Sequence, residues 1–71
     1  MNVYKIAYDT RWADDTWEHG SKNILAKDAE AAISKCRARV MAEKYTYPDT
    51  KKTVKRVAFR LQAVEYITDT D

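Results

Sequence analysis

The sequence predicts a small α+β domain in which one helix covers one face of a three-stranded sheet. Three observations lead to this class. Apolar residues recur at helical spacing over about 28–45, and alternation typical of strands occupies about 2–12 and 53–67. A further strand-like run, about 17–27, follows the first strand after a short polar stretch. The chain has 71 residues, so we expect 1–71 to form a single domain.

The first strand carries its aromatic residues on one side. Tyr4, Ile6 and Tyr8 alternate with polar or small neighbours, so these three side chains should face the helix. One face of the strand is therefore expected in the core, and the other in solvent.

The second strand should return beside the first as a long hairpin. Polar residues 13–16 make the turn. We expect a bulge at Gly20, because an isolated glycine in a strand often marks one. Such a bulge would let Ile24 and Ala26 face the core, which a regular ladder is not expected to do.

The helix has a clear start and a narrow apolar stripe. Asp28 is a suitable N-cap, and Glu30 lies in the first turn, where a negative charge favours the helix dipole. The stripe is expected to be the core face, and it comprises Ala29, Ala32, Ile33, Cys36 and Val40.

The opposite side of this helix carries few charges. Alanine is the best helix former, and an exposed Met or Tyr needs no special explanation. The same residues could instead form a second packed face against another copy or a partner. Both interpretations apply to Ala31, Ser34, Ala38, Met41, Ala42 and Tyr45.

The last strand should follow a turn at 46–52, in which Pro48 keeps the preceding residue out of helical geometry. The apolar parity of this strand changes after Ala63, to Val64 and Tyr66, which suggests a second bulge or a strand that passes beyond the helix. The residues expected on the covered face are Val57, Phe59, Leu61 and Ala63. Those expected on the open, polar face are Lys5, Asp9, Arg56, Arg60 and Gln62.

The simplest closure places the last strand beside the first. The sheet order would then be 2-1-3, with the second and last strands parallel through a right-handed crossover.

Composition excludes several classes of function. The net charge of +2 is too small to indicate nucleic-acid binding by itself. The single cysteine, Cys36, lies on the apolar stripe and is interpreted as a core residue rather than a reactive thiol. No run approaches the ~20 apolar residues of a membrane span, and no signal peptide is visible, so a cytoplasmic location without membrane contact is expected.

No catalytic set is visible in the sequence. One His and one buried Cys do not make a nucleophilic pair, and a single glycine cannot form a phosphate-binding loop. We therefore expect no enzyme activity and no cofactor. Four residues near the first turn could be imagined as metal ligands, but they lack ion-loop spacing, and we expect no metal site at Asp14, Asp15, Glu18 and His19.

Two surfaces could bind a partner. Trp12 and Trp17 flank the first turn, where they could clamp the hairpin or present two large anchors to a protein. With the outer helix face, the expected protein-binding residues are Trp12, Trp17, Ala38, Met41 and Tyr45. Basic and aromatic residues after the helix could alternatively bind single-stranded nucleic acid, through Tyr45, Tyr47, Lys51, Lys52, Lys55 and Arg56.

The run ILAKDAEAAISK resembles the strand and Asp-capped helix that open many small α+β proteins, including accessory proteins of phages and mobile elements. This is a resemblance of local structure, and it transfers no site. Our expectation is a non-enzymatic protein-binding module, an accessory or inhibitor protein that acts by contact and could form a homodimer. The alternative is weak binding of single-stranded nucleic acid.

Overall fold

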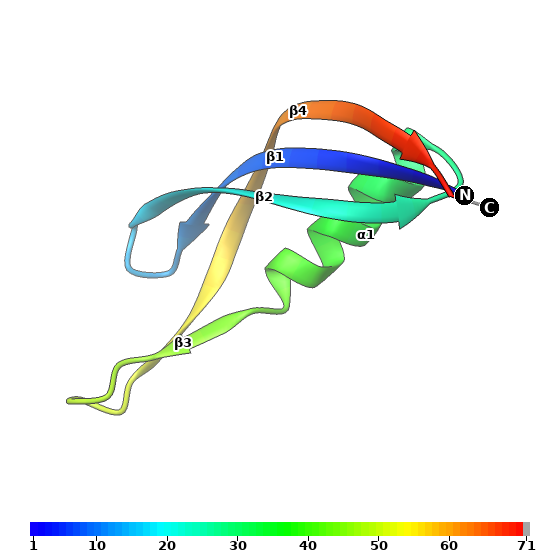
Figure 1. Cartoon of the computed structure of the whole chain (residues 1–71). Helices are drawn as coiled ribbons and strands as arrows, with labels where there is room; N and C mark the ends of the chain where they lie inside the picture. The colour runs from blue at the N-terminus through cyan, green and yellow to red at the C-terminus, as the bar shows by residue number, and fades with distance from the viewer. Residues whose placement is uncertain (71) are drawn as a thin grey trace.

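The computed structural model describes residues 1–70, which form one helix and an antiparallel sheet of four strands. The sheet order is β2-β1-β4-β3, so the second and last long strands run in the same direction on either side of β1. The small α+β class is confirmed, but the three-stranded order 2-1-3 is wrong (Figure 1). The elements are β1 (Asn2–Trp12), β2 (Trp17–Ala26), α1 (Ala29–Met41), β3 (Lys44–Thr46) and β4 (Thr53–Asp69).

The missed strand, β3, replaces the expected last turn of the helix. The helix ends at Met41, with Ala42 as its C-cap, instead of continuing to about 45. Tyr45 and Thr46 have high strand propensity, and β3 pairs with the first residues of β4. The hydroxyls of Thr46 and Thr53 lie 2.9 Å apart across this hairpin. A tertiary pairing therefore overrides a weak helical tendency.

The start of α1 agrees with the sequence. The side chain of Asp28 accepts a hydrogen bond from the backbone N–H of Ala31 at 2.8 Å, which satisfies one free donor of the first turn. Ala31 is packed against the core, so it does not belong to a free outer face.

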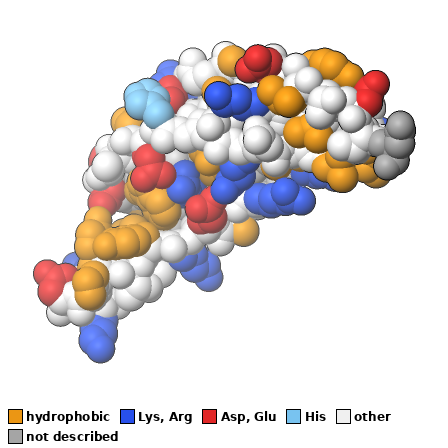
Figure 2. All heavy atoms as spheres, viewed as in Figure 1, with side chains coloured by type: hydrophobic (Ala, Val, Ile, Leu, Met, Phe, Trp, Pro, Cys, Tyr) orange, Lys and Arg blue, Asp and Glu red, His pale blue; other side chains and the backbone are white. Residues whose placement is uncertain are grey.

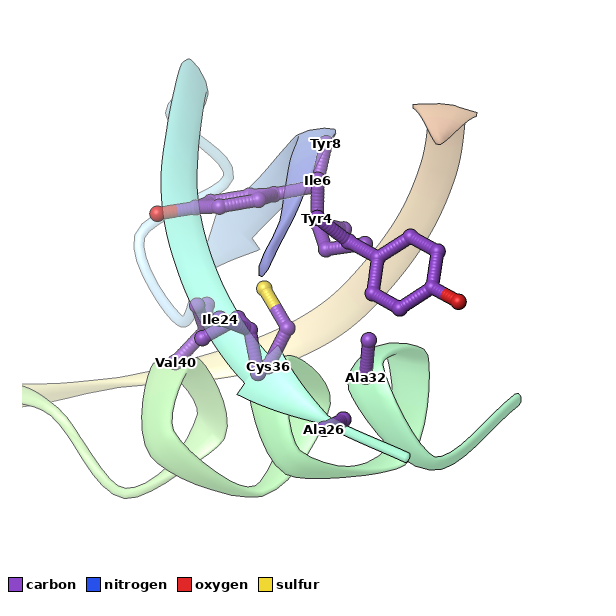
Figure 3. Packing of buried hydrophobic residues seen from close by; sticks show 8 residues of the cluster. All are labelled: Tyr4, Ile6, Tyr8, Ile24, Ala26, Ala32, Cys36 and Val40. Atoms are coloured by element: carbon purple, nitrogen blue, oxygen red, sulfur yellow. The ribbon is translucent and has the colours of Figure 1, made fainter. Parts of the chain in front are cut away.

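The helix packs its narrow stripe on the centre of the sheet. Cys36 and Val40 are fully buried, together with Ile6 and Ile24 from the two strands beneath them (Figure 3). Burying an aliphatic side chain of this size contributes about 1.5–3 kcal/mol. The expected contact between this stripe and the inner face of the first strand is confirmed. The buried core comprises Tyr4, Ile6, Tyr8, Ile24, Ala26, Ala32, Cys36 and Val40.

The expected bulge at Gly20 is wrong. The β1–β2 ladder runs without a register shift from Asn2–Ala26 to Arg11–Trp17, and Gly20 lies opposite Tyr8. Ile24 and Ala26 face the core because the turn length sets this register. The role of Gly20 is steric, since a Cβ there would lie 2.8 Å from Cζ and Oη of Tyr8. The glycine makes room for the Tyr8 ring.

Strand β4 contains the irregularities instead. Its pairing with β1 shifts at three places, and the extra residues on β4 are Val57, Gln62 and Ile67. The bulge predicted near Ala63 is therefore confirmed at Gln62. The expected faces of β4 need correction, because the first bulge turns Arg56 to the helix side, where it is buried, and the second turns Ala63 to the open face.

The molecule is elongated, with principal extents of 46 × 20 × 14 Å. The helix covers the sheet toward the end where the termini lie, and the β3–β4 hairpin extends away from it at the opposite end (Figure 1). The termini are joined by a hydrogen bond from the Thr70 N–H to the Met1 carbonyl, at 2.7 Å. The body of the domain is thus at one end, and the two hairpin turns project at the other.

Candidate functional site

The two hairpins contact each other beyond the end of the helix. The hydroxyl of Tyr47 donates a hydrogen bond to Oδ2 of Asp14 at 2.7 Å, which joins the β3–β4 loop to the β1–β2 turn. The backbone N–H of Ala13 donates to the carbonyl of Lys55 at 2.9 Å. These contacts connect residues more than thirty positions apart in the chain. The sequence analysis did not predict these contacts, because it considered the two turns as separate surfaces.

Local geometry fixes each turn. In the β1–β2 turn, Asp15 N–H donates to the Trp12 carbonyl, and Trp12 N–H to the Thr16 carbonyl, both at 2.9 Å. Asp15 has a φ of 69°, the left-handed conformation that ends a three-residue hairpin loop and that Asp tolerates better than most residues. In the second loop, Lys51 has a φ of 60°. The turns are tightly built, so they hold their flanking side chains in defined positions.

An aromatic notch lies between these turns. It has a volume of about 200 Å³. The rings of Tyr45 and Tyr47 meet edge to face, with centroids 5.0 Å apart and an interplanar angle of 86°. Tyr45 is 49% exposed, so its side of the notch is accessible to solvent. The lining residues are Trp12, Asp14, Thr16, Glu18, Tyr45, Tyr47 and Val54.

Arg56 packs against Trp12, one of the residues that line the notch. Its guanidinium carbon lies 4.4 Å from the centroid of the Trp12 ring, and its side chain is only 6% exposed. The guanidinium donates to Thr10 Oγ1 at 2.5 Å and to the carboxylates of Glu18 at 3.0 Å and Glu43 at 3.4 Å. A charge this deeply buried needs such partners. The network links β1, β2 and β4 to Glu43, which follows the helix, and places the Arg56 guanidinium against the Trp12 ring.

The hydrogen bond between Tyr47 and Asp14 affects the pKa values of both groups. The Tyr47 hydroxyl holds the pKa of Asp14 below its usual value, assisted by the hydroxyl and N–H of Thr16. The same hydrogen bond raises the pKa of Tyr47. At neutral pH the notch therefore contains an ionised Asp14 beside a neutral Tyr47.

The structure separates the expected protein-binding residues. Trp12 and Tyr45 line the notch, and Tyr45 lies on β3 rather than on the helix. Trp17 is on the open face of the sheet, where the guanidinium of Arg60 lies 4.7 Å from its ring centroid. Ala38 and Met41 are on α1 and do not line the notch. The two tryptophans thus point to opposite sides of the hairpin.

The basic and aromatic residues of the alternative site are also divided. Tyr45 pairs with Val54, and both line the notch, whereas the next pair along the ribbon, Lys44 and Lys55, alternates to the other face. Lys51 and Lys52 are exposed in the loop. Arg56 is buried and already paired with two carboxylates, so it is not free to contact a phosphate.

Asp9, Arg60 and Gln62 lie on the open face as the sequence predicted, but their contacts with one another and with His19 were not predicted. Asp9 is 8% exposed and interacts with His19 and with Gln62, whose amide donates at 2.7 Å. A guanidinium nitrogen of Arg60 lies 3.9 Å from the same carboxylate. The bulge at Gln62 brings that amide to Asp9, and only the registers of two strand pairs reveal this contact. No group of three or more potential metal ligands is found among residues 1–70.

Cys36 is fully buried, and burial raises the pKa of its thiol. Its interpretation as a core residue is confirmed.

Comparison of the chain with protein-family models, with curated proteins and with solved structures finds no match. Among the residues that the structure describes, none forms a helix long and apolar enough to cross a membrane.

Proposed function

We propose that the protein is a non-enzymatic binding module that uses the aromatic notch to hold a side chain of a protein partner. The observation that carries this proposal is the convergence of Trp12, Tyr45 and Tyr47 from two different hairpins onto one open notch. Aromatic side chains of this kind are enriched among the residues that dominate protein–protein binding energy. An accessory or inhibitory role through contact fits such a surface.

The size of the notch favours a side chain over a free small molecule. Typical small-molecule pockets have volumes of roughly 300–1,000 Å³. The notch has about 200 Å³ and one open wall, so it suits one apolar or aromatic side chain that remains attached to a larger surface. The buried Arg56 network supports the proposal further, because a preorganised site loses less conformational entropy when it binds.

Nucleic-acid binding is the less favoured function. The notch holds the carboxylates of Asp14 and Glu18, which repel phosphate, and the exposed lysines 44 and 55 alternate to the other face of the ribbon.

The test is selection of peptides from a displayed random library on immobilised protein. Peptides that bind the wild type should lose binding to a Tyr45→Ala variant by about 10- to 30-fold, which corresponds to roughly 1.4–2 kcal/mol. Trp17→Ala is the matched control, because it removes an exposed aromatic ring outside the notch and should bind the same peptides as the wild type. Loss of binding in the control alone would refute the notch as the site.

A gel-shift series with single- and double-stranded oligonucleotides tests whether the protein binds nucleic acid instead. Binding that weakens with salt and depends on Lys51, Lys52 and Lys55, but not on Tyr45, would replace the proposed function with nucleic-acid binding.

A further inference from the structure

The outer edge of β4 is unpaired over most of its length. Strand β3 pairs only with Thr53–Lys55, and from Arg56 to Asp69 no described residue forms a ladder with this edge. An unpaired edge presents a row of free backbone N–H and C=O groups to any extended chain. Proteins usually protect such an edge with charge, with proline or with a cover.

The same edge carries an unusual number of apolar side chains. Leu61, Val64 and Tyr66 are 39%, 36% and 53% exposed, and all three face the helix side of the sheet. None of the three belongs to the buried core cluster, although the ring of Tyr66 meets that of Tyr4 edge to face at 5.9 Å. Hydrophobic side chains lie on the surface toward the end where the termini lie, and also at the opposite end, near the β3–β4 hairpin (Figure 2). Exposed apolar patches beside an unpaired strand are typical of an interaction surface.

We propose that the occupant of this edge is a second copy of the same chain, paired antiparallel through β4 about a two-fold axis. The bulge at Gln62 is the first argument. In a regular strand, residues separated by an odd number of positions lie on opposite faces. The extra residue places Phe59 and Leu61 on the same face as Val64 and Tyr66.

This geometry is compatible with a self-pairing register in which the two bulges meet. If the axis passes between Gln62 and Ala63, Leu61 lies opposite Val64 of the second copy, and Phe59 lies opposite its Tyr66. Each of these pairs joins side chains of the same face, and the bulges of the two copies meet at the axis. A register centred on either neighbouring residue would bring side chains of opposite faces together near the axis.

Charge complementarity is the second argument, and it is independent of the first. In the same register Arg60 of one copy lies opposite Glu65 of the other, and symmetry makes this contact twice. Both side chains are on the open face, because Arg60 lies opposite Asp9 of β1 in the ladder and Glu65 lies opposite Lys5. Opposite charges directly across an antiparallel pair are stabilising. The dimer would thus extend the sheet from four strands to eight, with an apolar strip on the helix side.

Light scattering and sedimentation equilibrium on the full chain test this inference. We expect a mass that rises with concentration from 8.3 kDa toward twice that value. Val64→Lys should weaken the dimer by about 100-fold or more, because the change occurs twice and places a buried charge at the new interface. Leu25→Lys is the matched control, since Leu25 is 46% exposed on β2, the other edge strand, and this variant should dimerise like the wild type.

Cross-linking tests the register itself. In a Cys36→Ala background, a Leu61→Cys chain mixed with a Val64→Cys chain should form a disulfide on mild oxidation, because directly opposed residues lie within bonding distance. Neither chain alone should cross-link efficiently. A monomeric wild type at millimolar concentration would overturn the proposal, and so would equal dissociation of the β4 and β2 variants. A dimer that ignores Val64→Lys would exclude this edge.

Discussion

The close contact between Gly20 and Tyr8 makes a sharp prediction for the substitution Gly20→Ala. The added Cβ would lie 2.8 Å from Cζ and Oη of Tyr8 and 2.9 Å from Cε2. Favourable contacts between carbon atoms lie near 3.5–4.0 Å, so the ring would have to move by several tenths of an ångström. Tyr8 is only 5% exposed and is stacked on Phe59 with centroids 5.4 Å apart, which limits this movement.

The magnitude follows from two opposing effects. Overpacking of a well-packed site costs about 1–3 kcal/mol. Replacing glycine by alanine in a compatible backbone stabilises by about 0.4–1 kcal/mol, because the unfolded chain loses freedom. The net expectation is a loss of about 1–2 kcal/mol. For a domain of this size, that lowers the Tm by roughly 5–15 °C.

Calorimetric or circular-dichroism melts of a double-mutant cycle provide the assay. In a Tyr8→Leu background the ring is absent, so Gly20→Ala should become neutral or slightly stabilising. The coupling between the two positions is then the measured quantity. If Gly20→Ala raises the Tm of the wild type, or costs the same in both backgrounds, the steric role of this glycine is refuted.

Two further predictions concern the residues around the notch. Arg56→Met should destabilise the domain by about 1–3 kcal/mol in denaturant unfolding. This is less than the loss of a fully buried ion pair would cost, because Glu18 and Glu43 are half-exposed and can be hydrated. An unchanged unfolding midpoint would contradict the supporting role of the network. The hydrogen bond between Tyr47 and Asp14 should make Tyr47→Phe less stable than the wild type at neutral pH only. Folding lowers the pKa of Asp14. Its contribution to stability is therefore present above its pKa in the unfolded chain, about 4, and is lost as the pH falls through its pKa in the folded protein. The pKa of Tyr47 is raised, so its contribution is lost as the pH rises above about 10. A difference in Tm between the two proteins that does not shrink as the pH falls from about 7 to about 2 would disprove this link.

The sequence by itself determined the elements whose signals are local. Asp28 caps a helix because a short acceptor satisfies a free N–H of the first turn, and this needs no tertiary contact. The alternation of Tyr4, Ile6 and Tyr8 specifies which side of β1 is buried. The change of parity after Ala63 likewise revealed the bulge at Gln62, since a strand has a period of two.

Tertiary structure decided what depends on pairing between distant segments. Strand β3 has only three residues, and its pairing with the start of β4 stabilises it where local propensity allowed a helix. The turn length, rather than Gly20, sets the β1–β2 register. The bulge at Val57 turns Arg56 to the helix side, where it is buried, and strand alternation in the β3–β4 pair separates Lys44 and Lys55 from Tyr45. The candidate site belongs to this second group, because residues from two hairpins meet only when the sheet has formed, and side-chain contacts across a sheet depend on register rather than on composition.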